Sequence, residues 1–270
     1  MYKIGWFSTG RGGGSRNLLA AMQEAIKRGE VRAEIEFVFC SRKPGEAEGS
    51  DRFIRLVKDY GLPLVWFSYQ TFKKSRGSPP ANPDDLPDWR LDYDREVMAR
   101  LSGFYPDLCV LAGYMLVVGR EMCAKYRMLN LHPAAPGGPV GTWQEVIWQL
   151  IEDRATSSGV MMHLAVPELD RGPVVAYATF PIRSKDFDRY WAENAGLTVK
   201  QIRESQGEEN RLFKEIRRHG AARELPLVVA TVKAFSQGKI RITPPGLVLD
   251  DKDRLISGYD LTGEIEQKLK

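Results

Sequence analysis

The sequence predicts an α/β protein with an open, mostly parallel sheet flanked by helices. Short apolar runs typical of buried strands alternate with segments in which apolar residues recur at helical spacing. The links between most of them are short, and a glycine-rich segment joins the first strand to the first helix, as in parallel βα units. With 270 residues and 43% hydrophobic content, the chain can bury one large core. We expect a domain over residues 1–240 and a short C-terminal extension over 241–270 that packs on it or trails from it.

The first half of the chain contains four predicted strands with helices between them. The strands are Ile4–Ser8, Ile35–Cys40, Pro63–Phe67 and Asp107–Ala112, and the helices begin at Leu18 or span Asp51–Tyr60 and Asp88–Leu101. Residues 68–87 are polar and rich in proline, which predicts a long surface loop. Gly113 follows the fourth strand, where an open α/β sheet places its ligands.

The glycine-rich segment Thr9–Asn17 is a candidate phosphate site. Glycines let the backbone approach a ligand closely, and the N-terminus of the following helix offers free N–H groups. Arg11 and Arg16 would add charge-assisted hydrogen bonds. A strand-to-helix turn without a ligand explains the glycines about as well. The spacing fits neither a dinucleotide nor a triphosphate motif.

The second half continues the alternation of strands and helices. Its predicted elements are strand Leu129–Pro133, helix Gly141–Ile151, the apolar run Gly159–Val166, strand Val174–Pro181, helices Thr198–His219 and Leu225–Gln237, and strand-like pieces Ile240–Ile242 and Leu247–Leu249. They complete one sheet without an internal repeat.

The candidate catalytic residues lie on the first strand of this second half. Asn130 and His132 are two residues apart, so both side chains leave the same face of a strand. Asp170 lies on a turn that follows the next apolar run. An amide, an imidazole and a carboxylate together can stabilise an oxyanion while moving a proton. A single histidine after an apolar run is more often structural, but the combination of these groups with two strand ends favours a site.

The remaining histidines and the cysteines indicate no metal site. We expect His163 in the core or in a ligand wall, and His219 at a helix C-terminus, where the dipole favours it. No two histidines have metal-ligand spacing. Covalent acyl chemistry also lacks a candidate, because there is no G-x-S-x-G motif and no cysteine with a neighbouring histidine.

Charge and cysteine usage limit the partners and the compartment. The chain has 39 basic and 35 acidic residues, a formal charge of +4, and no block of five or six like charges. This balance favours anionic small molecules over nucleic acid. Three cysteines without a C-x-x-C spacing predict a reduced, cytoplasmic protein. No secretory or membrane-spanning apolar segment is evident, so we expect no membrane association.

Several motifs, in order along roughly the first 240 residues, resemble the glycinamide ribonucleotide (phosphoribosylglycinamide) formyltransferases, folate-dependent enzymes of purine synthesis. They are Ser8–Gly12 to Asn17-Leu18, Asp88–Arg90 with Tyr93–Glu96, Val110–Met115, Asn130–Pro133, His163, and Glu168–Asp170 through Gly172–Val174. The resemblance implies a Rossmann-like fold and transfer of a formyl group from 10-formyltetrahydrofolate to an amine. It implies small-molecule substrates, no metal, and allows a homodimer.

The resemblance also implies roles for individual residues. Asn130, His132 and Asp170 resemble the catalytic residues, with Asp170 favouring a charged imidazolium. Residues resembling the acceptor's phosphate site are Gly12, Gly13, Gly14, Ser15, Arg16 and Asn17. Residues resembling the folate site are Arg90, Tyr114, Met115, Leu116, Val117, Asn130, His163, Val166, Glu168 and Asp170.

Departures from the family pattern concern mainly the acceptor side. The glycine segment has about two extra residues, Leu116 replaces an arginine, and Pro167 replaces an acid. Residues 134–140 lack a lysine and a double leucine, and the acceptor's Glu-His pair is missing near Leu225. An amino sugar nucleotide therefore stays open as acceptor, as does a non-catalytic folate- or nucleotide-binding protein.

Two related activities fit the sequence less well. About thirty residues follow Ile240, too few for the RNA-contacting domain of methionyl-tRNA formyltransferases. Formyltetrahydrofolate hydrolases carry an N-terminal regulatory domain, whereas this chain starts on its first core strand.

Overall fold

In the computed structural model, which describes residues 1–76 and 86–270, eight strands form one sheet in the order β10-β7-β6-β5-β4-β1-β2-β3. The strands are β1 (Tyr2–Ser8), β2 (Ala33–Cys40), β3 (Leu64–Trp66), β4 (Leu108–Leu111), β5 (Met128–His132), β6 (Ser157–Leu164), β7 (Val174–Pro181) and β10 (Tyr259–Asp260). Strand β7 is parallel to β10 and antiparallel to β6, whereas β1–β2, β1–β4, β2–β3 and β4–β5 are parallel pairs. The mostly parallel sheet predicted from the sequence is confirmed.

The chain divides into two compact units. The first unit contains Met1–Asn130, Leu164–Gly172 and Val232–Ile242. The second contains Leu131–His163, Pro173–Thr231 and Thr243–Lys270. Strand β5 continues from one unit into the other after Asn130. The boundary expected near residue 240 stays a prediction.

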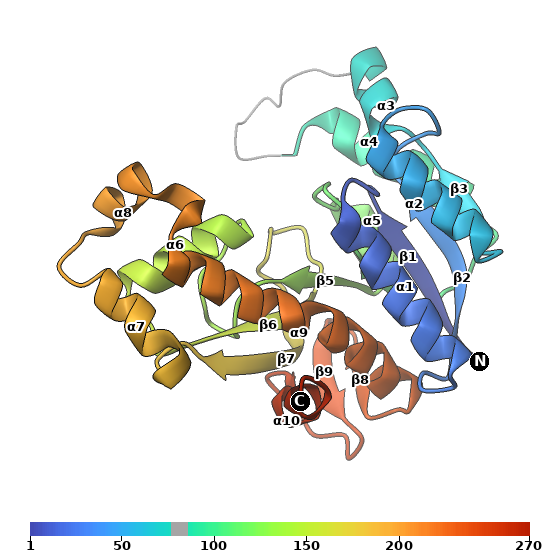
Figure 1. Cartoon of the computed structure of the whole chain (residues 1–270). Coiled ribbons are helices and arrows are strands. Elements are labelled where there is room, and N and C mark those ends of the chain that lie inside the picture. Colours follow the sequence, from blue (N-terminus) through green and yellow to red (C-terminus); the bar gives the residue numbers. More distant parts are fainter. Residues whose placement is uncertain (77–85) are drawn as a thin grey trace. The chain divides into compact units, whose positions relative to one another are not determined.

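The first unit has helices on both faces of its part of the sheet. Its helices are α1 (Gly13–Lys27), α2 (Glu48–Asp59), α3 (Tyr69–Arg76), α4 (Asp88–Arg100) and α5 (Arg120–Lys125). Helices α1 and α2 lie side by side on one face of β1 and β2 (Figure 1). Phe7, Phe37 and Phe39 point to the other face, because alternate residues of a strand share a face.

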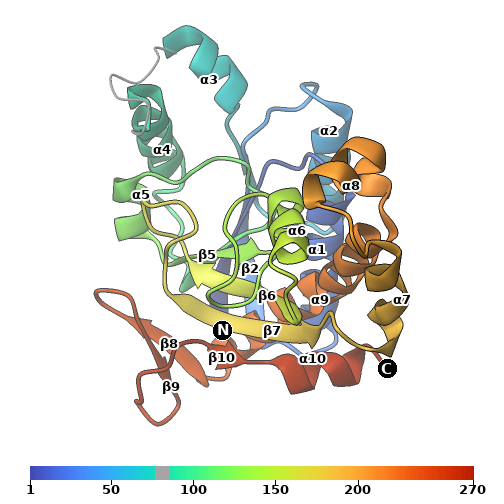
Figure 2. The same cartoon turned by 90° about the vertical axis from the view of Figure 1, so that its left-hand side faces the viewer.

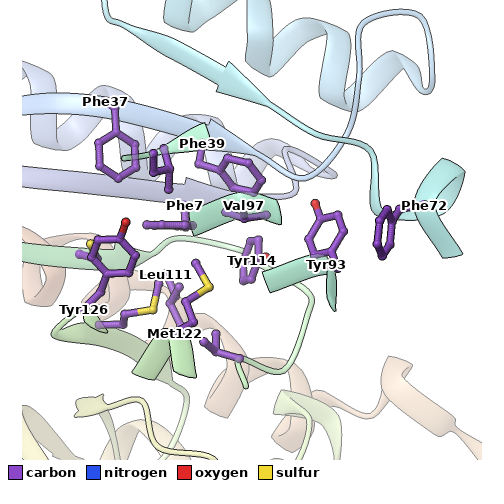
Figure 3. Packing of buried hydrophobic residues seen from close by; sticks show 14 of the residues in the cluster. Phe7, Phe37, Phe39, Phe72, Tyr93, Val97, Leu111, Tyr114, Met122 and Tyr126 are labelled. Atoms are coloured by element: carbon purple, nitrogen blue, oxygen red, sulfur yellow. The ribbon is translucent and has the colours of Figure 1, made fainter. Parts of the chain in front are cut away.

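The apolar cluster on that other face holds α4 and α5 against the strands. Figure 3 shows the Phe7 and Phe39 rings beside Tyr114, with Phe37 next to Phe7 and Tyr93 next to Phe72. The Phe7 ring centroid is 5.6 Å from that of Phe37 and 5.8 Å from that of Tyr114, both in edge-on geometry. Each such ring contributes about 1.5–3 kcal/mol by leaving water. This cluster positions the segment after β4 that contains predicted site residues.

The second unit is built on the β6–β7 hairpin. Its helices are α6 (Trp143–Glu152), α7 (Lys185–Glu193), α8 (Val199–Ser205), α10 (Thr262–Lys268) and most of α9 (Arg211–Ser236). Thr142 caps α6 with its side chain in a capping box with Glu145. Helix α10 runs beside β7 (Figure 2), and Thr262 Oγ1 accepts a hydrogen bond from the Thr179 amide at 3.1 Å.

Several local predictions were wrong. Residues 69–76 of the predicted loop form α3, which Phe72 anchors in the core; residues 77–85 of that loop lie outside the described residues. Helix α9 continues through residues 220–224, where the sequence predicted a break, and through Pro226. Proline costs a helix interior about 3 kcal/mol, and burial of the adjacent Leu227 and Val228 offsets that cost.

Three helices, α5, α7 and α10, were not predicted, and a two-stranded sheet of β8 (Ile240–Thr243) and β9 (Leu247–Asp250) accounts for the two strand-like pieces. In the described part of the chain, no helix is both long and apolar enough to cross a membrane.

Candidate active site

The predicted glycine loop is the N-terminus of α1. The helix begins at Gly13 rather than near Leu18, so residues 13–17 are helical and Gly12 is the N-cap. Gly12 has no side chain that could cap the helix, and Gly12, Gly13 and Gly14 are exposed. The first amide groups of a helix have no partner within the helix. A phosphate can therefore reach them without meeting a side chain.

Hydrogen bonds between the ends of neighbouring strands fix the segment that precedes α1. Thr9 donates its amide to the Gly113 carbonyl at 3.0 Å, and its Oγ1 accepts from the Met115 amide at 2.9 Å. Ser41, after β2, donates its hydroxyl to Thr9 Oγ1 at 3.0 Å. The ends of β1, β2 and β4 are thereby joined. Thr9 belongs to the predicted segment Thr9–Asn17, whereas Ser41 was not predicted; its position directly after an apolar strand is the signal that could have identified it.

Two glycines allow neighbouring segments of this region to approach one another closely. Gly113 has φ +70°, and a Cβ there would lie 2.4 Å from Ser15 Oγ on α1. A Cβ on Gly49, in the first turn of α2, would lie 2.2 Å from the Arg11 carbonyl oxygen. A side chain at Gly49 would clash with the backbone, and one at Gly113 would meet both the Ser15 hydroxyl and an unfavourable φ angle. Arg16 Nη1 donates to the Gly49 carbonyl at 3.5 Å and so links α1 to α2.

Arg90 is a buried cation, and only part of its hydrogen-bond donors have a partner among the described residues. Its side chain on α4 is 4% exposed, and Nη2 donates to Asp94 Oδ1 at 2.9 Å and to the Val117 carbonyl. Its Nε and Nη1 atoms have no hydrogen-bond partner among the described residues. Asp94 Oδ2 accepts from the Gly119 amide at 2.7 Å. Burial raises the pKa of Asp94, and the charge of Arg90 opposes this rise.

The segment Tyr114–Val117, predicted as folate-binding, lies against the same core. The Tyr114 ring is buried between Phe7 and Phe39, and burial raises the pKa of its hydroxyl. Met115 is exposed, Leu116 packs against the apolar cluster, and Val117 offers its carbonyl to Arg90. The segment therefore offers both an apolar and a polar surface.

The structure brings Asn130 and Asp170 together. Asn130 Nδ2 donates to Asp170 Oδ1 at 3.4 Å across forty residues of sequence. Asp170 has φ 55°, a conformation uncommon for residues other than glycine. The turn that contains Val166 and Glu168 is held to β5 by the Ala165 amide, which donates to the Met128 carbonyl at 2.7 Å. The turn thus presents a carboxylate to the end of β5.

In the second unit, His132 lies against His163. Both are 2% exposed, and their ring centroids are 6.1 Å apart at an interplanar angle of 81°. His132 Nε2 is 3.0 Å from the Pro139 carbonyl oxygen. Asn130 and His132 are two residues apart on β5, as predicted. The predicted action of Asp170 on His132 stays a prediction.

The prediction for His219 was wrong. The residue lies inside α9, not at its end, because the helix continues past Pro226. Its ring is 4.9 Å from that of Phe187, and Nε2 is 3.3 Å from Glu215 Oε1. Burial lowers the pKa of His219, as do the charges of Arg218 and Arg223. Over residues 1–76 and 86–270, no three histidine, cysteine or acidic side chains are grouped so that they could hold a metal.

The fold resembles those of solved formyltransferases and of a solved formyltetrahydrofolate deformylase. A phosphoribosylglycinamide formyltransferase from Coxiella burnetii superposes with a TM-score of 0.66 at 21% identity, over 96% of this chain and 98% of that one. A formyltetrahydrofolate deformylase from Pseudomonas syringae superposes with a TM-score of 0.55 at 16% identity, over 90% of this chain and 64% of that one. At these identities the likeness establishes the fold alone.

Sequence relatives define the family more closely. The phosphoribosylglycinamide formyltransferase of Escherichia coli is 33% identical over 175 residues, which cover 64% of this chain and 72% of that protein. The enzyme of the same name from Dictyostelium discoideum is 30% identical over 64% of this chain and 82% of its own length. The formyl transferase family model matches residues 12–195. This chain therefore belongs to the formyl transferase family.

Proposed function

We propose that this protein transfers the formyl group of 10-formyltetrahydrofolate to the amine of glycinamide ribonucleotide, in purine biosynthesis. The contact between Asn130 and Asp170 carries the proposal, because the amide and the carboxylate expected from the motifs meet at the end of β5. Three relatives named phosphoribosylglycinamide formyltransferase, each with 64% of this chain aligned, support the choice of acceptor.

The catalytic step is a direct transfer. The acceptor's amine attacks the formyl carbon, and the new oxyanion is held by the Asn130 amide and by a protonated His132. Asp170 favours the charged imidazolium. The intermediate collapses by breaking the bond to the folate nitrogen. One proton leaves the amine and one reaches the folate nitrogen, through His132 or a water molecule, so no net charge is created.

The folate site is proposed around Arg90. Buried N–H groups that lack a partner are costly, so the free Nε and Nη1 of Arg90 favour a bound acceptor group such as a carboxylate or a pterin oxygen. The segment Tyr114–Val117, residues 166–170 and His163 complete the proposed site.

The phosphate of the acceptor is proposed to bind the first turn of α1. Within the predicted segment 12–17, the exposed Gly12, Gly13 and Gly14 leave the first amides of the helix open, and Arg16 lies in the same turn. Arg11 follows Gly10 at the same approach and adds an exposed cation beside the half-buried Arg16.

A second candidate is the same chemistry with a different amine, such as an amino sugar nucleotide. Residues 134–140 after His132 support it, since they differ from the family pattern on the acceptor side. A protein that binds folate without turnover is a third outcome to test.

The test is an assay of the purified protein with 10-formyltetrahydrofolate, with and without glycinamide ribonucleotide, following tetrahydrofolate. Acceptor-dependent turnover that is lost in His132→Ala supports the proposal. Folate binding with no turnover on this acceptor refutes it, and amino sugar nucleotides are then assayed. Turnover without any amine identifies a hydrolase.

We further propose a cytoplasmic protein that acts on small molecules and forms a homodimer. Sedimentation equilibrium of the full chain tests the dimer: a single monomer mass across the concentration range would refute it.

A further inference from the structure

Helix α3 carries three basic residues and no acidic one. Lys73, Lys74 and Arg76 lie in its second half, and all three are exposed. Cations near the C-terminus of a helix interact favourably with the helix dipole, which is reason enough for a basic helix end. The dipole does not explain why two of these cations contact α4, since Lys73 lies over Trp89 and Arg76 pairs with Asp92.

The first unit holds α3 in a fixed position. Ser68 Oγ accepts a hydrogen bond from the Thr71 amide at 3.1 Å and so satisfies a donor of the first turn. Phe72 is 8% exposed, and its ring lies 5.7 Å from that of Tyr93 on α4. Helices α3 and α4 are in contact (Figure 2). The cations of α3 are therefore presented from a packed helix beside the start of α4.

The ring of Trp89 joins the basic end of α3 to Arg90. Lys73 Nζ lies 5.5 Å from the centroid of this ring, and Arg90 Cζ lies 5.6 Å from it. Both distances are within the range of cation–π contacts. Two cations, one from each helix, thus lie close to the same ring. An anionic ligand that extends from Arg90 along this ring meets further positive charge on α3.

Two acidic residues lie within one turn of Trp89 on α4. Asp88 is exposed in the first turn of the helix. Asp92 pairs with Arg76 at 3.9 Å and with Arg95 at 2.9 Å. Because two arginines share the carboxylate of Asp92, this residue does not neutralise the three cations of α3. The excess of positive charge favours a ligand with several carboxylates.

From this arrangement we propose that α3 binds the additional glutamates of a polyglutamylated folate, so that the protein prefers a folate with a polyglutamate tail. The proposal rests on the proposed folate site. A folate ends in one glutamate, and each further γ-linked glutamate adds one carboxylate. Arg90, whose Nε and Nη1 lack a partner among the described residues, binds a carboxylate of the first glutamate. Lys73 and Arg76 bind those of the following glutamates.

The expected preference is modest because the cations of α3 are exposed. An exposed ion pair strengthens binding only roughly 1.5- to 5-fold, since water and side-chain entropy offset the attraction. Two such pairs, one for each added glutamate of a triglutamate, predict binding about 5- to 10-fold tighter than that of the monoglutamate. Salt screens exposed charges, so the preference should largely disappear between about 0.05 M and about 0.5 M ionic strength.

The first experiment measures the affinity of the full chain for folic acid and for its triglutamate form by calorimetry, without an acceptor. We expect the triglutamate to bind about 5- to 10-fold more tightly at low salt. Equal affinities overturn the proposal and leave the proposed folate site intact. Failure of both ligands to bind refutes the folate site and the proposal with it. Neither result depends on whether glycinamide ribonucleotide is the acceptor.

The second experiment removes two cations of α3 in the double variant Lys73→Gln/Arg76→Gln. The matched control is Arg55→Gln/Lys58→Gln on α2, whose two exposed cations have the same spacing and whose loss changes the net charge equally. We expect the α3 variant to bind both folates with affinities that differ less than about 2-fold. The control should keep the preference of the unmodified protein.

Two outcomes of the second experiment contradict the proposal. One is a preference for the triglutamate that survives in the α3 variant. The other is an equal loss of the preference in the control, which would assign it to the net charge of the protein. If the α3 variant does not fold, the salt dependence in the unmodified protein decides: a preference that persists at about 0.5 M ionic strength overturns the proposal.

Discussion

Arg90 on α4 and Arg223 on α9 are both buried arginines, but they differ in how many of their nitrogens have a hydrogen-bond partner. Arg223 is 6% exposed, and its Nε donates to Glu266 Oε1 and its Nη1 to the His219 carbonyl, each at 2.7 Å. Its Nη2 lies 2.6 Å from the same Glu266 oxygen. Arg90 leaves Nε and Nη1 without a partner among the described residues. A buried arginine with a partner at each nitrogen stabilises the fold, whereas one with free donors is suited to a ligand.

The histidines of the second unit show the same contrast. His219 lies among aromatic rings beside Glu215, inside a helix. His132 lies at the end of a strand and is held by a backbone carbonyl. Four predictions test this division between fold and function.

The largest effect is expected for His132→Ala. Loss of one oxyanion donor lowers kcat about 10²–10³-fold, and because the buried ring leaves a cavity, the melting temperature should fall as well. The matched variant His219→Ala should keep kcat and melt earlier. Steady-state kinetics and thermal unfolding of both proteins measure this. Equal losses of kcat in the two variants would remove the distinction between the histidines.

Arg90→Lys should act on folate binding. The lysine keeps a positive charge near Asp94 but loses the free donors of the guanidinium. Charge-assisted hydrogen bonds are worth about 1.5–3 kcal/mol, so KM for 10-formyltetrahydrofolate should rise roughly 10- to 100-fold. Arg223→Lys should leave this KM unchanged. An unchanged KM in Arg90→Lys would mean that the free donors face no ligand.

Arg223→Ala should act on stability alone. Removing one partner of a buried ion pair costs about 3–5 kcal/mol, but Glu266 is 38% exposed and can return to water. We therefore expect a loss of about 2–3 kcal/mol in the free energy of unfolding, measured with urea.

The control for that loss lies on the same helix. Arg211 pairs with Glu193 at 2.7 Å but is 60% exposed. Arg211→Ala should lose less than about 1 kcal/mol. A similar loss in both variants would argue against a structural role specific to Arg223.

The smallest effect concerns pH. Because the pKa of His219 is lowered in the folded state, the unfolded chain binds a proton more readily as the pH falls below the ordinary value of 6.5. The free energy of unfolding should therefore decrease from about pH 7.5 to about pH 5.5. His219→Gln should reduce this slope.

The groups around His219 act on its pKa in opposite directions. Glu215 favours the charged ring, whereas burial, Arg218 and Arg223 disfavour it. The free energy of unfolding is measured with urea at both pH values. If it decreases as much in His219→Gln as in the unmodified protein, other residues cause the pH dependence.

Local sequence patterns predicted much of the fold. Strand Val174–Pro181 was predicted to the residue, and most other strands to within two residues, because buried strands are short apolar runs between turns. Helices α3 and α5 each bury one residue, Phe72 and Met122 respectively, so they lack an apolar periodicity that a sequence reveals. Strand β10 has two residues and exists through its pairing with β7.

The sequence by itself determined the chemical groups of the candidate site and their place at strand ends, since Asn130 and His132 share a strand face by spacing alone. Only the tertiary structure decided their partners. The contact of Asp170 with Asn130, the free donors of Arg90 and the carbonyl of Pro139 at His132 depend on backbone positions far apart in the chain or on left-handed turns. Such contacts leave no periodic signal, because packing and hydrogen bonding between distant segments fix them.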